Sequence, residues 1–527
     1  MKEPGAGGAD GLARPGFEAA RMGRLAVGLF TLIAAGIGIW LLVGCGQGSS
    51  GAEPAARNGS DVPVVLVVLD ELPTANLMTR DGKRIDRRRY PEIARFASRS
   101  TWYRDNVAAG DFTAWAVPPI FTGNLSDQET LPTAEAQPES IFTELGPGRR
   151  LHVLEPVTEL CPRSLCPEGR QGEADDETYA DDFVKAKFHP FRPSEADAWI
   201  ERIPAGRGTL TVGHIESPHQ PLRFTPEGKT YRPGILAVPT DLDVNGWTTR
   251  EPAVAFVQQR HLIQTGFADR IVGKLMRKIR RNGDWNRALI VLTADHGNSF
   301  DPNDLRRDVT WTNPGATVNP PLFIKYPGQT KGAVSTAPTQ AIDVFPTIAR
   351  TLAATIPETD GEPIGEARPG RRMTVSRDEM RTIQLTADDV RADRKGVLAD
   401  QYRRLGDRGL WRLGPRGELF GRPVRRVRAR RGASYRPLNG AASIRNADSS
   451  NRVVPALVSG SLRGVGEGSV VAVAWNGRIV ATTRAFRFRG STYFGAMVPP
   501  SVMRKGRNRV TVLSVGPEGR LRRIRPS

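Results

Sequence analysis

Two apolar stretches of the sequence end abruptly in residues that can bind a metal or move a proton. Residues 62–70 read VPVVLVVLD and end at Asp70, and residues 289–296 read LIVLTADH and end at Asp295 and His296. Apolar runs rich in β-branched residues are typical of strands buried on both faces of a parallel sheet. In open α/β sheets, ligands bind at the carboxyl ends of the strands. An acid and an imidazole buried there need a partner, and we expect that partner to be a metal ion.

Two further stretches lie between these runs. Residues 110–124 read GDFTAWAVPPIFTGN, and residues 211–221 read TVGHIESPHQP, which begins as an apolar strand and then carries His219 between prolines. Segments that follow different parallel strands meet at one edge of the sheet. We therefore expect parts of both stretches to join the acidic residues at that edge.

The elements that position these residues alternate between strands and helices. Strand-like apolar runs occupy 62–70, 289–293 and 320–328, and helical spacing of apolar residues occurs in 90–100, 260–283 and 339–353. This alternation predicts an α/β domain with a doubly wound, mostly parallel sheet.

The pattern changes towards the C-terminus. Residues 363–440 are rich in Gly, Pro and Arg, with weak periodicity, which indicates a connector crossing the surface. Residues 441–527 contain short alternating runs, and Asn476–Gly477 between two of them predicts a hairpin. We interpret this last region as a small all-β module.

The expected organisation has five parts. They are a signal or membrane anchor (1–45), a flexible tether (46–60), a catalytic domain (61–362), the connector (363–440) and the basic β-module (441–527).

Positive charge is concentrated in the last quarter of the chain. The whole sequence has a net charge of +19, but residues 401–527 hold 27 basic and 5 acidic side chains, so the remainder is nearly neutral. Such a region indicates contact with an anionic lipid surface or cell-wall polymer, or only a solvated arginine-rich face. Nucleic acid is not expected as a partner, because no nucleic-acid-binding motif is present.

The N-terminal segment indicates an extracytoplasmic protein. Leu25–Val43 contains no charged residue and follows several arginines. This length can span a bilayer, and basic residues ahead of it favour a cytoplasmic N-terminus. Leu42–Cys45 also resembles a bacterial lipoprotein signal, in which Cys45 would be lipidated. Either a single-pass anchor or a lipoprotein would place the rest of the chain on the outer face of the cell membrane.

The other two cysteines, Cys161 and Cys166, are five residues apart in LCPRSLCPEG. An oxidising compartment permits a small loop disulfide between them. A zinc site is the alternative, but no second Cys/His pair accompanies them.

Four motifs together carry a family resemblance. VVLDE, TAWAVPPIFTG, PHQP and TADHGN occur in an order and spacing that resemble the sulfatase-like family of the alkaline phosphatase superfamily, over residues 62–355. PPLFIKYPGQ and DVFPTIARTL also fit this resemblance. It implies a metal-dependent enzyme with an alkaline phosphatase-like fold.

The resemblance also locates a nucleophile. Sulfatases carry Cys-x-Pro-x-Arg, with a Thr-Gly pair whose Thr lies nine residues after the Cys. Counting back from Thr122 of Thr122–Gly123 places Thr113 at the Cys position, and Val117 replaces the Arg. The chain therefore lacks the residues of a formylglycine sulfatase. It is more similar to the threonine branch, which includes lipoteichoic-acid synthases and phosphoethanolamine transferases.

A threonine hydroxyl is a weak nucleophile that needs activation, which a divalent cation can supply. The expected ligands are Asp70, Thr113, Asp295 and His296, and the metal is Mn, Zn, Ca or Mg. His219 would hold the phosphate or protonate the leaving oxygen.

Other residues have weaker assignments. Glu71 is a second-choice ligand, and Lys325 could reach the anion, although a snorkelling lysine is the simpler interpretation. His214 is expected to be structural, and the remaining histidines (His152, His189 and His261) are assigned no role.

The expected activity is the hydrolysis or transfer of a phosphoester group, or less readily a sulfate ester, of envelope lipids or glycans through a phospho-threonine. A plain phosphodiesterase or sulfuric ester hydrolase is one alternative. A non-catalytic envelope-binding protein on the same scaffold is the other.

Overall fold

The computed structural model describes residues 61–167, 179–237, 246–302, 304–365, 369–378, 381–438 and 440–527. The expected anchor, Cys45 and the tether lie outside these residues. Within the described ranges, no helix is both long enough and apolar enough to cross a membrane. Ala56–Ser527 forms one compact unit.

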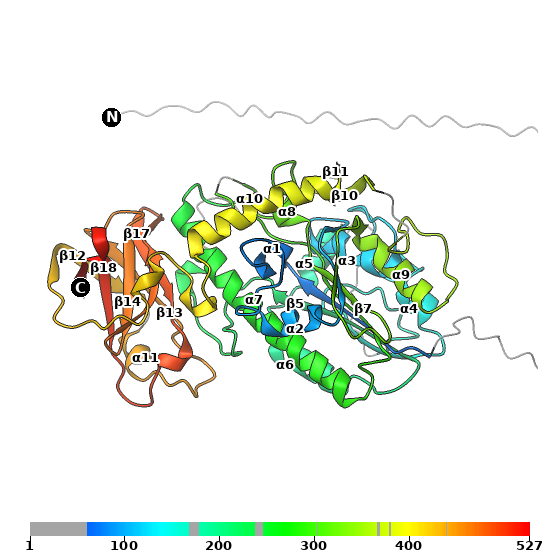
Figure 1. Ribbon diagram of the computed structural model, residues 1–527, viewed down its shortest axis with the longest axis horizontal. Helices are drawn as coiled ribbons and strands as arrows, with labels where there is room; N and C mark the ends of the chain where they lie inside the picture. Colours follow the sequence, from blue (N-terminus) through cyan, green and yellow to red (C-terminus); the bar gives the residue numbers. More distant parts are fainter. Residues whose placement is uncertain are drawn as a thin grey trace, which may run out of the picture. The chain divides into compact units, whose positions relative to one another are not determined.

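A seven-stranded sheet organises the first part of this unit (Figure 1). Its strand order is β4-β5-β1-β6-β7-β2-β8. The strands are β1 (Val64–Asp70), β2 (Thr101–Tyr103), β4 (Arg150–Leu154), β5 (Thr209–Pro218), β6 (Leu289–Ala294), β7 (Leu322–Lys325) and β8 (Ala333–Ser335). Strands β4, β5, β1 and β6 are mutually parallel, whereas β7 runs antiparallel to both of its neighbours. The predicted α/β class with a mostly parallel sheet is confirmed.

Helices cover both faces of this sheet because alternate residues of β1 point in opposite directions. Val65, Val67 and Leu69 belong to one core, with side chains of α2 (Pro91–Ala97), α6 (Pro193–Arg202) and α7 (Glu251–Arg281). Val64, Leu66 and Val68 belong to a second core, with side chains of α3 (Thr113–Thr122), α4 (Ile141–Leu145) and α9 (Val344–Thr351). Each fully buried Val or Leu stabilises the fold by about 1.5–3 kcal/mol, so β1 is strongly fixed at the centre of the domain.

Short elements complete this part. They are α1 (Thr74–Leu77), β3 (Asn106–Val107), α5 (Ala180–Lys187), η1 (Gly234–Leu236), α8 (Pro314–Thr317), β9 (Thr339–Gln340) and η2 (Ala341–Asp343).

The antiparallel direction of β7 bears on the expected role of Lys325. Lys325 pairs with Ile290 near the start of β6, at the end of the strand opposite to Asp295. Its Nζ donates to the Tyr326 carbonyl oxygen at 3.2 Å and lies over the Trp285 ring. Lys325 therefore lies at the edge of the sheet opposite to Asp295, which does not fit the possible role of Lys325 as an anion contact.

The expected connector contains regular structure. A hairpin of β10 (Met373–Arg377) and β11 (Arg381–Leu385) leads into the 19-residue helix α10 (Ala387–Leu405), drawn in yellow in Figure 1. Thr386 caps α10 by accepting from the Asp389 N–H. The apolar periodicity is weak because two positions on the buried face are polar, Arg394 and Gln401. Two 3₁₀ turns follow, η3 (Leu410–Arg412) and η4 (Gly417–Leu419).

The C-terminal region is an eight-stranded sheet in the order β15-β14-β18-β19-β12-β13-β17-β16. Its elements are β12 (Ala429–Pro437), α11 (Ala441–Arg445), β13 (Leu457–Arg463), β14 (Val470–Trp475), β15 (Arg478–Arg484), β16 (Phe486–Phe488), β17 (Ser491–Met497), η5 (Pro500–Val502), β18 (Val510–Val515), η6 (Pro517–Gly519) and β19 (Leu521–Pro526). The sheet begins before residue 441 because β12 pairs with β13 and β19. Asn476 and Gly477 both have positive φ and connect β14 to β15, which confirms the predicted hairpin.

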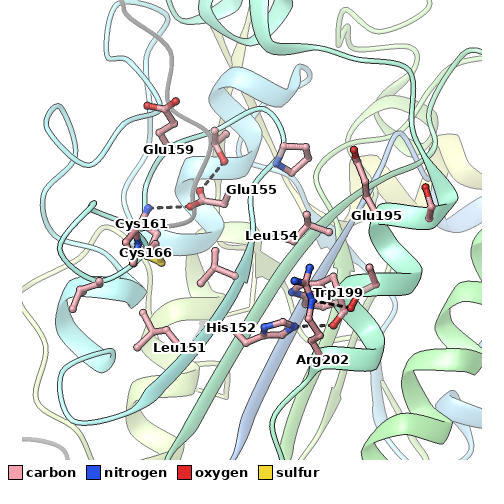
Figure 2. Close-up of a pocket in the computed structure, with 17 residues that line it drawn as sticks. Leu151, His152, Leu154, Glu155, Glu159, Cys161, Cys166, Glu195, Trp199 and Arg202 are labelled. Atoms are coloured by element: carbon pink, nitrogen blue, oxygen red, sulfur yellow. Dashed lines mark hydrogen bonds between the residues drawn. A yellow bond between two sulfur atoms is a disulfide. The ribbon is translucent and has the colours of Figure 1, made fainter.

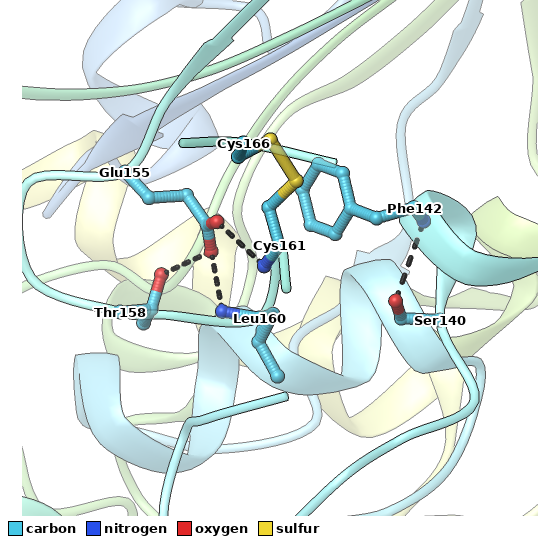
Figure 3. Close-up of a disulfide and its surroundings, with 7 residues drawn as sticks. All are labelled: Ser140, Phe142, Glu155, Thr158, Leu160, Cys161 and Cys166. Atoms are coloured by element: carbon cyan, nitrogen blue, oxygen red, sulfur yellow. Dashed lines mark hydrogen bonds between the residues drawn. A yellow bond between two sulfur atoms is a disulfide. The ribbon is translucent and has the colours of Figure 1, made fainter. Parts of the chain in front are cut away.

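The loop after β4 carries a disulfide between Cys161 and Cys166 (Figure 3). The Glu155 carboxylate accepts from the backbone N–H groups of Leu160 (3.1 Å) and Cys161 (2.9 Å) and from the Thr158 hydroxyl (2.8 Å). These hydrogen bonds fix the backbone of the loop at Leu160 and Cys161, where the disulfide is attached.

Candidate active site

Three metal-ligand side chains meet at the carboxyl edge of the parallel strands. Asp70 ends β1, His214 lies on β5, and Asp295 follows β6. One ligand atom from each lies within 4.8 Å of the others, and His214 Nε2 is 3.8 Å from Asp70 Oδ2. They converge because β1 lies between β5 and β6, with Val68 in register with His214.

Thr113 and His296 join this group. Thr113 Oγ1 donates to Asp295 Oδ2 at 3.1 Å, and the His296 backbone N–H donates to Asp295 Oδ1 at 2.6 Å. His296 Nδ1 lies 2.8 Å from the Gly297 carbonyl oxygen, which assigns the proton to Nδ1. His296 Nε2, the other ring nitrogen, is 3.5 Å from Asp295 Oδ2. The structure thus groups the expected Asp70 and Asp295 with His214, and it places the expected Thr113 and His296 against Asp295.

The donor atoms of this group suit a divalent cation. Asp70 Oδ1, both ring nitrogens of His214 and His296 Nε2 are buried and have no hydrogen-bond partner among the described residues. Buried polar atoms without partners cost free energy that a bound cation would remove. Two carboxylates, two imidazoles and a hydroxyl are typical ligands of Zn²⁺ or Mn²⁺. The residues present therefore fit such an ion.

The pKa shifts of Asp70 and His214 agree with this set of metal ligands. Burial raises the pKa of Asp70 well above its ordinary value, and the nearby Asp295 and Glu71 carboxylates raise it further. Burial lowers the pKa of His214 to about 4, so its imidazole is neutral near pH 7. A neutral imidazole has the lone pair that metal binding requires.

Glu71 lies beside the metal-type group but is held by other partners. Its backbone N–H donates to Asp295 Oδ1 at 3.0 Å, from a residue with a positive φ of 61°. Its carboxylate accepts from Asn298 Nδ2 (2.8 Å) and Arg307 Nε (3.2 Å), and Arg306 Nη1 is 3.8 Å away. Burial alone would raise the pKa of Glu71, but the two arginines lower it to a net value below the ordinary range. Glu71 Oε1 is therefore held by Asn298 and Arg307, whereas Oε2 is buried without a hydrogen-bond partner among the described residues, so the expectation of Glu71 as a further ligand stays a prediction.

His219 contacts the same arginine. Its Nδ1 lies 2.6 Å from the Gln220 carbonyl oxygen, so Nδ1 carries the proton and Nε2 accepts from Arg307 Nη2. Burial lowers the pKa of His219 to about 3, although the Glu71 carboxylate opposes this shift. His219 therefore helps to position the Arg307 guanidinium, and its expected role at a phosphate stays a prediction.

Two side chains of helix α7 form hydrogen bonds to the backbone of Glu71 and His219. His261 Nε2 donates to the Glu71 carbonyl oxygen at 3.1 Å, and Asn76 Nδ2 donates to His261 Nδ1 at 2.9 Å. Three residues further on, Gln264 Nε2 donates to the His219 carbonyl oxygen at 2.7 Å. Sequence reasoning missed this role, because His261 and Gln264 are two of several buried polar residues on α7 and no local pattern sets them apart.

The N-terminus of α3, which is the positive end of the helix dipole, lies in the same region as Asp295 and Arg307. Thr113 is its first residue, and Phe112 before it provides no side-chain cap. The guanidinium of Arg307 lies 5.3 Å from the centre of the Phe112 ring. Uncapped N–H groups at a helix start attract anions, so the nucleophile candidate lies beside two sources of positive potential.

A separate cavity of about 620 Å³ lies beside edge strand β4 (Figure 2). Its lining includes His152 and Trp199, whose rings stack with centroids 5.5 Å apart. It shares no residue with the groups above.

This fold and site define an α/β enzyme scaffold with a metal-type centre around a buried hydroxyl. Residues 247–354 match the family model described as Sulfatase, a segment that contains Asp295, His296 and Arg307. The resemblance to the sulfatase-like family is confirmed over that segment.

Individual relatives are more distant. An ulvan-active sulfatase from Formosa agariphila is 29% identical over 190 residues, which cover 34% of this chain and 36% of the relative. The chain thus spans about a third of that relative's length. A phosphonate monoester hydrolase from Silicibacter pomeroyi aligns with 18% identity and a TM-score of 0.40, over 60% of this chain and 79% of the other. One from Agrobacterium radiobacter aligns with 15% identity and a TM-score of 0.41, over 60% and 80%.

Proposed function

We propose that the protein is a metal-dependent hydrolase or transferase of the sulfatase-like type, which cleaves a phosphoester through Thr113. The observation that supports this most directly is the 3.1 Å hydrogen bond from Thr113 Oγ1 to Asp295 Oδ2, beside Asp70 and His214. A hydroxyl placed against a carboxylate in a metal-type donor set has the arrangement of an activated nucleophile.

The residues have defined tasks in this reaction. A bound divalent cation would lower the pKa of the threonine hydroxyl and neutralise phosphoryl oxygens. As Thr113 Oγ forms its bond to phosphorus, Asp295 Oδ2 is placed to receive the hydroxyl proton. The bond from phosphorus to the leaving oxygen breaks, and that oxygen takes a proton from water. Water or an acceptor alcohol then attacks the phospho-threonine and restores the Thr113 hydroxyl.

The anion would lie between Arg307 and the start of α3. Arg307 is oriented by Glu71 and His219, so its position does not depend on the substrate. Charge-assisted hydrogen bonds from a fixed guanidinium are about twice as strong as neutral ones. A group whose negative charge grows in the transition state gains most from such fixed donors.

A sulfate ester is the second substrate class. The match of residues 247–354 to the Sulfatase model and the similarity to an ulvan-active sulfatase favour it. Thr113 and Val117 in place of the Cys and Arg of formylglycine sulfatases favour the phosphoester.

The same proposal includes the cellular setting. The apolar segment Leu25–Val43 supports anchoring to the cell membrane with the catalytic domain outside. The strongly basic residues 401–527 support an anionic envelope polymer as the substrate or a binding partner of the C-terminal module.

Thr113 variants test the mechanism. Purified protein with added Mn²⁺ or Zn²⁺ is assayed on bis-p-nitrophenyl phosphate and on p-nitrophenyl sulfate. We expect Thr113→Ala to abolish turnover and Thr113→Ser, which keeps the hydroxyl, to retain part of it. Mass spectrometry of trapped wild-type enzyme should locate a phosphoryl group on Thr113. Unchanged turnover in the alanine variant would refute this mechanism, and no turnover in any protein would favour the non-catalytic alternative.

A further inference from the structure

A basic groove lies beside β8, the last strand of the seven-stranded sheet. The groove has a volume of about 760 Å³, and four cationic side chains line it: Lys83, Arg84, Arg87 and Arg95. Its apolar lining includes Ile85 and Val334. None of its lining residues belongs to the candidate active site.

The four cations of this groove outnumber the two carboxylates that act on them, Asp81 and Glu92. Lys83, Arg84 and Arg87 are exposed, and none of their side chains forms an ion pair or hydrogen bond with a described residue. Arg95 pairs with Glu92. No carboxylate is among the described residues that line the groove. Asp81 lies nearby, where it accepts from the Thr79 hydroxyl at 2.6 Å and from the Lys83 backbone N–H at 3.1 Å.

The positive surface extends to the end of α7. Arg95 in the groove and Arg277 on α7 both contact Glu92. Burial, together with Arg95 and Arg99, lowers the pKa of the Arg280 guanidinium. Arg280 is held over the Trp285 ring at 3.7 Å from its centre. Arginines of α7 therefore lie next to the groove.

The groove also presents apolar surface. Val334 on β8 is 55% exposed, and β8 pairs with β2 on only one side. Trp102 forms part of the wall, and its Nε1 is buried without a hydrogen-bond partner among the described residues. Cations above an apolar floor suit an amphiphile whose anionic headgroup binds the guanidinium groups while its hydrocarbon covers the floor.

We propose that this basic groove docks the protein on a bilayer that contains anionic phospholipids. A polysaccharide fits less well, because the described lining offers only the Ser98 hydroxyl and the buried Trp102 indole N–H as neutral hydrogen-bonding groups for sugar hydroxyls. The proposal is independent of the catalytic one, since the two sites share no residues. It assigns lipid contact to the first part of the fold and leaves the C-terminal module for polymers.

Vesicle binding tests this proposal with the compact unit Ala56–Ser527, which omits the apolar N-terminal segment. Co-sedimentation is measured with vesicles of phosphatidylglycerol and phosphatidylcholine, and with phosphatidylcholine alone. We expect binding only to the anionic vesicles, and weaker binding as salt is raised. Replacing three cations by Lys83→Ala, Arg84→Ala and Arg87→Ala should weaken binding about a hundredfold. Val334→Asp should weaken it as well.

A charge-matched variant is the control. Arg425→Ala, Arg428→Ala and Arg431→Ala remove three exposed arginines from the C-terminal region and should leave vesicle binding unchanged. Loss of vesicle binding in this control, with retention in the groove variant, would overturn the proposal. Loss of binding to a soluble sulfated polysaccharide, but not to vesicles, in the groove variant would identify a glycan site instead. Circular dichroism checks that the variants are folded, and this readout does not depend on catalytic activity.

Discussion

Asp70→Asn should raise the stability of the metal-free protein and weaken the stabilisation of the protein by metal. In the metal-free protein, Asp70 is 2% exposed, its Oδ1 has no partner among the described residues, and two further carboxylates, Asp295 and Glu71, lie beside it. Asparagine has nearly the same shape and no charge. The substitution therefore removes buried like-charge repulsion and should raise the free energy of unfolding of the metal-free protein.

The magnitudes make both effects measurable. An uncompensated buried polar group costs about 1–3 kcal/mol and a charged one more, and the substitution removes the charge while it leaves a buried amide. A ligand at a concentration of 100 times its Kd stabilises the folded state by about 2.7 kcal/mol. Wild-type protein should gain that amount with Mn²⁺ or Zn²⁺, whereas Asp70→Asn should lose most of the gain. The variant should therefore be the more stable protein in chelator and lose that advantage in metal.

Urea unfolding followed by tryptophan fluorescence measures both effects, first in EDTA and then with added metal. Asp343→Asn is the matched control, because Asp343 is equally buried but accepts from the Gln340 N–H, the Glu362 N–H and Arg371 Nη1. That control should be destabilised in both conditions and keep the wild-type response to metal. A destabilised metal-free Asp70→Asn, or one with an undiminished metal response, would refute the reasoning.

Three further predictions concern other parts of the fold. The Asp269 carboxylate accepts from the Ile93 N–H at 2.7 Å, and burial raises its pKa from 3.8 to about 7. As pH rises from 4 to 7 the unfolded chain releases this proton before the folded protein does, so the free energy of unfolding should fall over that range. Asp269→Asn should flatten that fall in urea titrations. An unchanged dependence of stability on pH would contradict the raised pKa of Asp269. His214→Gln should weaken metal binding at least about tenfold by isothermal titration calorimetry, whereas an equal Kd would remove His214 from the ligand set. Gly297→Ala would place a Cβ 2.1 Å from the Ala316 carbonyl oxygen and should destabilise the fold by about 1–3 kcal/mol, which an unchanged thermal midpoint would disprove.

The sequence alone located the strands that carry the chemistry. Continuous apolar runs ending at Asp70 and Asp295 predicted two parallel strands, because burial on both faces leaves a clear local pattern. The carboxyl ends of neighbouring parallel strands meet at one edge, so the meeting of these two residues followed from local information. Thr113 was selected as the candidate nucleophile by family resemblance instead, since no local pattern marks such a residue.

The tertiary structure decided which other side chains reach that edge. His214 reads as one polar residue within an apolar strand, and only the register of β5 against β1 places it beside Asp70. Lys325 reads as a strand-end cation, and only the antiparallel direction of β7 moves it to the opposite edge. Strand direction and register depend on contacts between distant segments, so no local pattern encodes them.

The same limit applies to the arginine that would bind the anion. Arg307 meets Glu71, 236 positions earlier in the sequence, in a buried ion pair. Such a pair forms only when folding brings the two segments together. Removal of water from both charges costs free energy, and only their close contact in the interior offsets that cost. The sequence thus determined the scaffold and its acidic residues, and tertiary packing determined the full set of donors around them.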